Sequence, residues 1–278
     1  MERIDLHTHS TASDGSFTPT QVIEAAARAG LKAVALTDHD TIAGIPEAMT
    51  ASEKYDIEFI PGIELSAFYL NQEVHIVGLF LDINDEQFIQ RLENFRQIRD
   101  QRNIAMIRKM TEAGIDISIE KIREMDGDAV ITRANFARYL LHIGYISSIG
   151  EAFDKYLSPG KPFFVPKTGV TPRDAIQAIC DNGGIAILAH PLSYKFTSSQ
   201  LDTCIELLKS YGLKGIETRY STFSAADERD MKRLADRHGL LYSGGSDFHG
   251  NVKPHISIGK GMGKLLVPYD FLKRLKDV

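Results

Sequence analysis

The chain has 278 residues, of which 43% are hydrophobic and 25% are charged, an ordinary composition for a folded globular protein. Its 32 Lys and Arg residues against 37 Asp and Glu residues give a net charge of −5, which excludes a generally basic protein that binds long duplex nucleic acid. No run approaches the roughly 20 apolar residues of a membrane span, and the N-terminus lacks the pattern of a secretory signal. The two cysteines form no motif and suit a reducing compartment, so we expect a cytoplasmic protein without membrane contacts.

Short apolar runs alternate with helical patterns along most of the chain. The runs cover residues 4–6, 33–36, 58–63, 74–81, 185–189, 215–218 and 240–243. Helices are predicted from capping and turn signals near residues 18–30, 42–55 and 171–184, and one before each of the last two runs. This alternation predicts parallel β/α units. Because no glycine-rich phosphate loop follows the first run, we expect a seven-stranded (β/α) barrel rather than an open Rossmann sheet.

The segment from about 84 to 167 breaks this rhythm. It contains a helical pattern over 85–113, a second one over 133–142 that begins after Thr132, and a return loop at 159–162. We therefore predict a barrel formed by residues 1–83 and 168–278 and a helical insertion formed by residues 84–167. The insertion is expected to cover the active face, because it follows the fourth strand. Its arginine series is expected to form mainly a solvated helix face and consists of Arg91, Arg96, Arg99, Arg102 and Arg108.

Six of the nine histidines lie at the apolar runs, most of them just beyond a run. They are His7, His9, His39, His75, His190 and His249, and acidic residues share these places at Asp14, Asp38, Asp40, Glu64 and Asp247. The carboxyl ends of barrel strands converge on one face, where active sites are built. So many ionisable groups brought together are costly to bury unless a cation pairs with them. The pattern therefore predicts a metal centre.

The spacing of individual residues supports this interpretation. His7 and His9 alternate with Thr8 on a strand, so their side chains point to the same side about 7 Å apart, and Asp247 and His249 repeat this geometry. Imidazole and carboxylate without cysteine suit divalent Zn, Mn or Fe. The three remaining histidines, interpreted as ordinary surface or helix-end residues, are His142, His238 and His255.

The motifs together resemble those of the PHP (polymerase and histidinol phosphatase) family, in particular its stand-alone phosphoesterases. They are DLHTHS at 5–10, TDHD at 37–40, PGIE at 61–64, His75, AHP at 189–191 and GSDFH at 245–249, in the family's order. The resemblance implies a distorted seven-stranded barrel that holds two or three divalent metals, with Mn favoured over Zn or Fe. The implied ligand sets are, for the first metal, His7, His9, Glu64 and Asp247; for the second, Glu64, His75 and His190; and for the third, Asp14, His39 and His249. His7, His9, Glu64 and Asp247 are also the implied catalytic residues.

The same resemblance implies hydrolysis of phosphate esters by direct attack of hydroxide that the metals activate. The implied substrates are nucleoside 3′,5′-bisphosphates or the 5′ ends of short oligonucleotides, and Arg133, Arg219 and Ser221 are predicted to contact them. Asn135 and Phe223 depart from the pattern near the substrate, which leaves another small phosphomonoester, such as a nucleoside monophosphate or a sugar phosphate, as the alternative. An amidohydrolase-type enzyme is disfavoured because no lysine ends an apolar run. A non-catalytic metal-stabilised module is disfavoured because structural sites close with about four ligands.

Overall fold

The computed structural model describes residues 2–70, 72–127, 129–166 and 169–278 and contains an eight-stranded sheet rolled into a nearly closed barrel. The strands follow the order β7-β6-β5-β4-β3-β2-β1-β8. Their bounds are β1 Arg3–Asp5, β2 Ala33–Leu36, β3 Glu58–Tyr69, β4 Gln72–Leu79, β5 Ile185–Leu188, β6 Gly215–Tyr220, β7 Leu241–Gly245 and β8 Val267–Pro268. The predicted (β/α) barrel is confirmed, and a two-residue strand, β8, pairs antiparallel with β1 beyond the seven predicted strands.

The barrel closes where the residues after β1 meet β7. The Leu6 amide donates to the Gly244 carbonyl (3.2 Å), the Asp247 amide to the His7 carbonyl (2.9 Å) and the His9 amide to the Phe248 carbonyl (2.9 Å). Glycine is required at this closure, because a Cβ at Gly245 would overlap the His7 backbone. The closure therefore holds the segment that carries His7 and His9 against the segment that carries Asp247 and His249.

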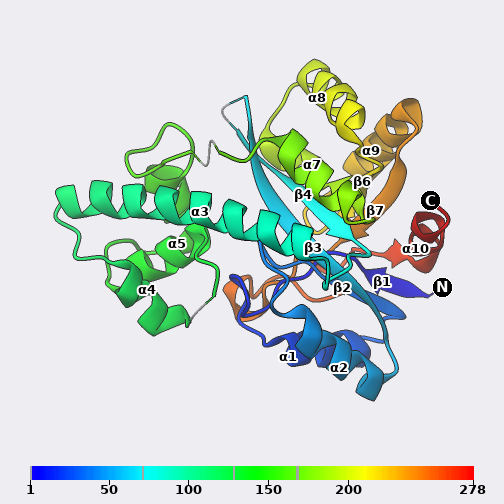
Figure 1. Cartoon of the computed structure of the whole chain (residues 1–278), viewed down its shortest axis with the longest axis horizontal. Coiled ribbons are helices and arrows are strands. Elements are labelled where there is room, and N and C mark those ends of the chain that lie inside the picture. The colour runs from blue at the N-terminus through cyan, green and yellow to red at the C-terminus, as the bar shows by residue number, and fades with distance from the viewer. Residues whose placement is uncertain (1, 71, 128, 167–168) are drawn as a thin grey trace.

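Helices cover the outside of the barrel on two sides (Figure 1). The helices outside the insertion are α1 Pro19–Arg28, α2 Ile45–Tyr55, α7 Pro172–Asp181, α8 Ser198–Tyr211, α9 Ala225–His238 and α10 Tyr269–Lys276. Threonine capping boxes begin α1 and α7 at the predicted Thr18 and Thr171, and each helix has proline in its first turn. The last helix, α10, follows β8 and was not predicted, although its apolar face, Phe271, Leu272 and Leu275, is buried against the barrel.

The insertion projects from one end of the molecule (Figure 1). Its elements are α3 Glu86–Glu112, α4 Ile119–Asp126, α5 Arg133–His142, α6 Ile149–Ala152 and a π-helical turn, Phe153–Leu157. It has its own apolar cluster, which includes Met106, Phe136 and Leu140, whereas Phe88 and Leu92 at the start of α3 pack in the barrel cluster. The predicted boundary at 167/168 lies outside the described residues, so the division into two domains stays a prediction.

The insertion was expected to cover the active face because it follows the carboxyl end of the fourth strand. This reason is wrong, because β4 is not parallel to its neighbours. It pairs antiparallel with both β3 and β5. Its carboxyl end, Leu79, therefore lies at the end of the barrel opposite the predicted active face, and its first half carries His75 to that face. The 27-residue helix α3, about 40 Å long at 1.5 Å per residue, then carries the chain back along the barrel.

The expectation of a solvated arginine face on α3 is wrong for two of its members. Arg99 and Arg102 are buried, with 2% and 4% of their surface exposed, whereas Arg96 and Arg108 are exposed. The helical period places Arg99, Arg102 and Met106 on the side that faces the barrel and the rest of the insertion. Among the described residues, no helix is both long and apolar enough to cross a membrane.

Candidate metal centre

The predicted ligand residues converge at one end of the barrel. His7 and His9 follow β1, His39 follows β2, His190 follows β5, and Asp247 and His249 follow β7. Glu64 lies within β3 opposite Val77 of β4, and His75 lies opposite Ser66, so the antiparallel β4 aims its first half at the same place. All nine predicted ligands are buried except His75, which is partly buried.

Glu64 lies at the centre of this cluster. Five imidazole nitrogens lie within 3.3 Å of its two carboxylate oxygens. Oε1 contacts His75 Nδ1 (2.8 Å) and His190 Nε2 (3.0 Å). Oε2 contacts His7 Nε2 (3.1 Å), His9 Nε2 (3.2 Å) and His39 Nδ1 (3.3 Å). A single buried carboxylate therefore has each of its oxygens directed at a different set of ligand side chains, as a residue that bridges two cations would.

Two further carboxylates flank Glu64. Asp247 Oδ1 lies 3.3 Å from His9 Nε2 and 3.3 Å from His249 Nδ1. Asp14 Oδ1 lies 3.2 Å from His249 Nε2, and Asp14 Oδ2 lies 3.9 Å from His39 Nε2. The described residues form four groups whose ligand atoms lie within 4.8 Å of one another: His9, Asp14, His39 and His249; His7, Glu64 and His190; His7, His9 and Asp247; and His39, Glu64 and His75.

These groups partly match the ligand sets that the family resemblance implies. The third set, Asp14, His39 and His249, is brought together with His9 added. The second set, Glu64, His75 and His190, shares Glu64 but is divided between two of the groups. The assignment of particular ligands to particular ions therefore stays a prediction.

Several residues that orient the ligands were missed in the sequence. Glu217 of β6 accepts from His7 Nδ1 (2.9 Å) and from the His190 amide (2.6 Å), and Glu73 of β4 lies 3.2 Å from His75 Nε2. Tyr220 donates to Asp247 Oδ2 (2.7 Å), and Lys253 also contacts that oxygen (2.7 Å). Such partners fix the orientation and basicity of metal-binding side chains. Of these residues, Glu217 could have been found from the sequence, because it is a carboxylate within the predicted strand at 215–218.

Backbone strain is concentrated beside the cluster. Asp40, His190 and Asp247 have positive φ angles of 51°, 27° and 55°, although none of them is glycine. Such conformations cost of order 1–3 kcal/mol each and persist where the surroundings over-determine them. For Asp247, the hydrogen bonds of its amide to His7 and of its carboxylate to Tyr220 supply that constraint. From these positions the side chains of His190 and Asp247 point into the cluster, whereas Asp40 lies beside it and accepts from the Ser66 amide and from Arg99.

The charges of the cluster shift its pKa values in opposite directions. Burial alone would lower the pKa of His9, but Asp247 and Glu64 outweigh burial and raise it to about 9. Against the same effect of burial, Glu64 and Glu73 raise the pKa of His75 to about 9. Burial lowers the pKa of His39 to about 3. Burial would raise the pKa of Glu64, but the surrounding imidazoles hold it well below its usual range.

The donor atoms fit divalent cations. His7 Nε2, both ring nitrogens of His9, His39 Nδ1 and His190 Nδ1 are buried and make no hydrogen bond within the described part of the chain. Buried polar atoms are nearly always satisfied, so these orphaned nitrogens require another partner. Mixed imidazole nitrogen and carboxylate oxygen donors without thiolate suit Mn, Fe or Zn.

Metal affinity is expected to rise as the pH is raised from about 6 to about 9. Below their raised pKa of about 9, His9 and His75 hold protons, and only the neutral rings bind a cation, so metal binding must displace those protons. Calorimetry of Mn²⁺ binding near neutral pH, in two buffers that differ in ionisation enthalpy, should show proton release. A binding constant that does not change over this pH range would contradict the proposed ligand role of the two histidines.

Of the three predicted substrate residues, only Arg133 lies beside the histidine cluster in the described part of the chain. Arg133 of α5 lies 3.4 Å from Glu73 and lines two cavities beside the cluster, of about 210 and 530 Å³. Arg219 forms an ion pair with Glu228 of α9 (2.9 Å), and Ser221 donates to the Ser246 carbonyl, so neither meets the histidine cluster in this structure. The placement of Arg219 follows from a register shift between Glu217 and Arg219 in β6. The shift keeps Glu217 and Tyr220 on the inner face of the barrel and leaves Arg219 on the side of α9. The substrate contacts of Arg219 and Ser221 stay predictions.

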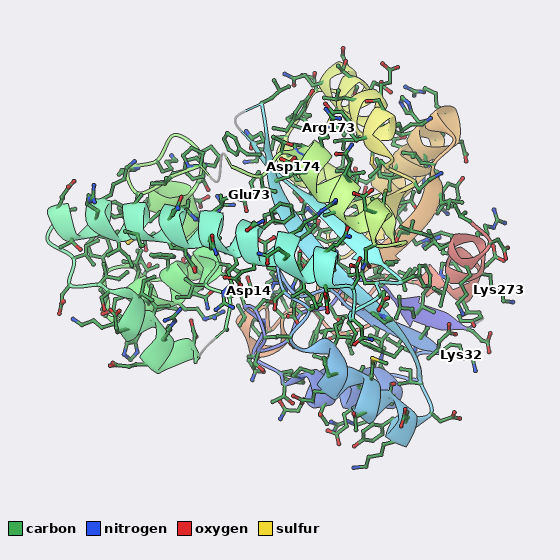
Figure 2. The ribbon with its side chains drawn as sticks, in the orientation of Figure 1. Asp14, Lys32, Glu73, Arg173, Asp174 and Lys273 are labelled. Carbon is green, nitrogen blue, oxygen red and sulfur yellow. The ribbon has the colours of Figure 1, made fainter. Side chains whose placement is uncertain are left out.

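The insertion meets the barrel beside the cluster. Thr132 donates to Asp14 Oδ2 (2.8 Å), Arg138 donates to the Asp14 carbonyl (2.8 Å), and Arg133 contacts Glu73. Figure 2 shows Asp14 and Glu73 at this junction between the insertion and the barrel. The insertion therefore contributes side chains to the walls of the site.

Comparison with known proteins agrees with this geometry. The PHP domain model matches residues 5–161. A 5′-3′ exoribonuclease of Haemophilus influenzae is 39% identical over 89% of this chain and 90% of its own length. A 3′,5′-nucleoside bisphosphate phosphatase of Chromobacterium violaceum is 38% identical over 90% and 88%. A solved structure from Chromobacterium violaceum, described as an amidohydrolase with bound sulfate and no metal, superposes with a TM-score of 0.88 at 34% identity, covering 99% of this chain and 96% of its own.

A barrel with a buried histidine and carboxylate cluster at one end defines a metal-dependent class of proteins. Within that class, the chain belongs to the PHP domain family, since the family model covers more than half of it and relatives match along nearly all of their length.

Proposed function

We propose that the chain is a metal-dependent phosphoesterase that hydrolyses nucleoside 3′,5′-bisphosphates or removes nucleotides from the 5′ ends of short oligonucleotides. The observation that carries the proposal is the buried Glu64 carboxylate with five imidazoles around it, next to a cavity lined by arginine and lysine. The names of the relatives supply the substrate class.

His7, His9, Glu64 and Asp247 are the proposed catalytic residues. Together with Asp14, His39, His75, His190 and His249 they would hold two or three divalent ions, with Mn²⁺ as the favoured metal and Zn²⁺ or Fe²⁺ as alternatives. Bound divalent ions supply positive charge to the phosphate oxygens and lower the pKa of water toward neutrality. Glu217 holds the His7 ring through Nδ1, which leaves Nε2 directed at Glu64 and the centre of the cluster. Tyr220 and Lys253 fix Asp247 in the same way.

The surroundings of the cluster suit a substrate larger than inorganic phosphate. The smaller cavity is bordered by Arg99, Arg133 and Lys253, and the larger one by Arg133, Lys161 and Lys195. Both include Phe153 of the insertion, a flat apolar side chain of the kind that packs against a nucleobase. Cationic side chains together with an aromatic one are compatible with a phosphorylated nucleotide.

A substrate screen tests this proposal. The purified, Mn-loaded protein would be given nucleoside 5′-monophosphates, 3′,5′-bisphosphates, sugar phosphates, a cyclic phosphodiester and short RNAs. Product release, ranked by kcat/KM, should place bisphosphates or short 5′-phosphorylated RNA first. A sugar phosphate at the top of the ranking would favour the alternative of a general small phosphomonoester phosphatase. No hydrolysis of any phosphate ester would contradict the proposal.

Replacing Arg133 with alanine is expected to raise KM about tenfold or more, which corresponds to about 1.4 kcal/mol of lost binding. A guanidinium grips a phosphate through two parallel hydrogen bonds. Arg133 contacts Glu73 through Nη2 (3.4 Å) and donates from Nη1 to the Leu157 carbonyl (3.3 Å), which leaves further N–H donors for this purpose. Steady-state kinetics on the best substrate would measure the change. Arg123→Ala, at an exposed site on α4 of the insertion, is the matched control and should leave KM unchanged. An unchanged KM in Arg133→Ala would remove Arg133 from the substrate site.

A further inference from the structure

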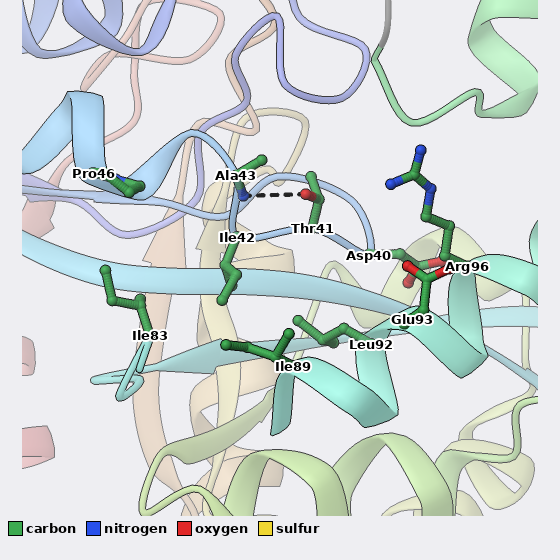
Figure 3. Close-up of a pocket in the computed structure, with 10 residues that line it drawn as sticks. All are labelled: Asp40, Thr41, Ile42, Ala43, Pro46, Ile83, Ile89, Leu92, Glu93 and Arg96. Carbon is green, nitrogen blue, oxygen red and sulfur yellow. Dashed lines mark hydrogen bonds between the residues drawn. The ribbon is translucent and has the colours of Figure 1, made fainter. Parts of the chain in front are cut away.

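The insertion contacts the barrel at places of different chemical character. At the start of α3 the contact is mainly apolar, and Ile89 and Leu92 line a cavity of about 330 Å³ together with Ile42 from the loop after β2 (Figure 3). None of the described residues that line this cavity is a predicted metal ligand. At the loop after β1 the contact is polar and includes the predicted ligand Asp14. The second contact therefore joins the insertion directly to the metal centre.

Hydrogen bonds run from the insertion to the loop that carries Asp14. The Val130 amide donates to the Ala12 carbonyl (3.2 Å). Thr132 Oγ1 donates to Asp14 Oδ2 (2.8 Å), and Arg138 Nη1 donates to the Asp14 carbonyl (2.8 Å). Thr132 and Asp14 are buried, with 5% and 3% of their surface exposed, so water competes little for the bond between them.

The Thr132 hydroxyl has one hydrogen and two acceptors within reach. Asn135 Oδ1 lies 3.0 Å away but already accepts from the Thr132 amide (2.7 Å). Asp14 Oδ2 lies closer, at 2.8 Å, and a charged acceptor forms the stronger hydrogen bond. The hydroxyl therefore donates to Asp14, while its oxygen accepts from the Ala134 amide (3.1 Å) and caps α5.

The same part of the insertion holds the backbone of Asp14. Asn135 Nδ2 donates to Asp126 Oδ2 (2.9 Å), and Asp126 accepts from Arg138 through both of its oxygens (3.1 and 3.0 Å). Arg138 then reaches the Asp14 carbonyl. The path from the side chain of Asp14 back to its carbonyl thus runs through residues of α4 and α5 and the N-cap of α5. A displacement of α5 from the barrel must either move Asp14 or break these bonds.

The other oxygen of the Asp14 carboxylate faces the histidines. Oδ1 lies 3.2 Å from His249 Nε2 and 3.9 Å from His9 Nδ1. Because Thr132 holds Oδ2, Oδ1 stays directed at the group formed by His9, Asp14, His39 and His249, named here the Asp14 group.

Ligands elsewhere in the centre are oriented from the barrel itself. Glu217 accepts from His7 and Tyr220 donates to Asp247, and both of these orienting residues belong to β6. The orienting hydroxyl of Asp14 comes instead from the insertion. The Asp14 group therefore depends on where the insertion lies.

We propose that Thr132 is a positioning residue that fixes Asp14 from the insertion and couples the position of the insertion to the cation affinity of the Asp14 group. This inference rests on the proposed function, because it takes the Asp14 group to be a metal site. Residues that orient metal ligands typically contribute a factor of about 10 to 100 to metal affinity. Because coupling between two equilibria is reciprocal, a cation in the Asp14 group also holds α5 against the barrel.

Thr132→Val tests the coupling, because valine keeps the branched shape of the side chain and removes the hydroxyl. The metal-free protein would be titrated with Mn²⁺, and the free ion measured by electron paramagnetic resonance. One binding step should weaken by about tenfold to a hundredfold, and the other steps should not change. Activity should require correspondingly more Mn²⁺, and kcat at saturating Mn²⁺ should approach that of the wild type. Thr132→Ser, which keeps the hydroxyl, should bind Mn²⁺ within about twofold of the wild type.

Hydrogen exchange measures the same coupling from the side of the insertion. In the wild type, Mn²⁺ should slow exchange of the Val130 amide, which is bonded to Ala12, and of the amides that begin α5. In Thr132→Val this slowing should be smaller at Mn²⁺ concentrations that fill the unchanged sites. A purely structural role of Thr132 predicts faster exchange by the same factor with and without metal, and that result would overturn the proposal.

Thr171→Val is the matched control. Thr171 begins α7 with the same type of capping box, and its hydroxyl bonds to Asp174, which is not a predicted ligand. This variant loses an N-cap and should bind Mn²⁺ like the wild type. If Thr132→Val does not fold, Thr132→Ser and Thr132→Ala provide the comparison, because they differ by a single hydroxyl.

The outcomes separate this inference from the proposed function. A wild-type protein that binds no Mn²⁺ would overturn both. Binding of Mn²⁺ by the wild type with unchanged affinity at every step in Thr132→Val would overturn the coupling alone. An equal loss of affinity in Thr132→Ser or in Thr171→Val would also overturn it, because the hydroxyl donor to Asp14 is present in both variants.

Discussion

Glu64→Gln is expected to lower kcat/KM by at least about a thousandfold, or about 4 kcal/mol of transition-state stabilisation. Glutamine keeps the shape of the side chain but removes the charge that five imidazoles surround. It also replaces one oxygen by an NH₂ donor, which cannot bind a cation and points at the imidazole nitrogens. The variant should therefore lose bound metal as well as activity.

Elemental analysis and kinetics on the same preparations would measure both losses. Glu93→Gln removes a carboxylate from an exposed position of α3 and should retain full metal content and activity. Because the cluster is buried, circular dichroism should verify that Glu64→Gln is folded before its kinetics are interpreted. A folded Glu64→Gln protein with wild-type metal content would show that Glu64 is not a ligand.

The double replacement of His7 and His9 by alanine is expected to remove metal and activity together. The two rings contribute three of the five orphaned buried imidazole nitrogens of the described residues and contact both Glu64 and Asp247. Their loss removes two of the five imidazoles around Glu64 and both of these contacts of Asp247 Oδ1, so the mixed coordination sphere loses nitrogen donors. Elemental analysis of the dialysed protein should show less than the wild-type content of Mn.

The matched control for this double variant is His142→Ala with His255→Ala. It also removes two histidines, but both are exposed and lie outside the cluster. Metal content and kcat/KM of the control should equal those of the wild type. Full metal content in the variant that lacks His7 and His9 would contradict the assignment of these residues.

The barrel could be predicted because its elements carry strong local signals. The run at 33–36 matches β2, and the helix predicted over 133–142 matches α5 with its Thr132 N-cap. The convergence of the histidines followed from the placement of most of them at strand ends in a β/α barrel. His75 did not fit that rule, and the antiparallel direction of β4 explains why it nevertheless joins the site.

The remaining features depend on tertiary contacts that leave little trace in the sequence. A short apolar run has the same composition in either strand direction, so nothing marked β4 as antiparallel. Arg99 and Arg102 are typical of a solvated helix face until Asp40 and Glu73 are known to lie nearby. The bulge in β6 that turns Arg219 toward Glu228 is likewise a property of the β6 and β7 pairing.

Phosphate release measured against bound metal tests the central claim most directly. The wild-type protein would be stripped of metal with a chelator and titrated with Mn²⁺, while inorganic phosphate is measured from adenosine 3′,5′-bisphosphate. We expect no release from the stripped protein and a rate that rises with bound Mn²⁺ until the sites around Glu64 are filled. An undiminished rate in the stripped protein, or no release at full metal loading, would contradict the claim that this cluster is a metal-dependent phosphoesterase centre.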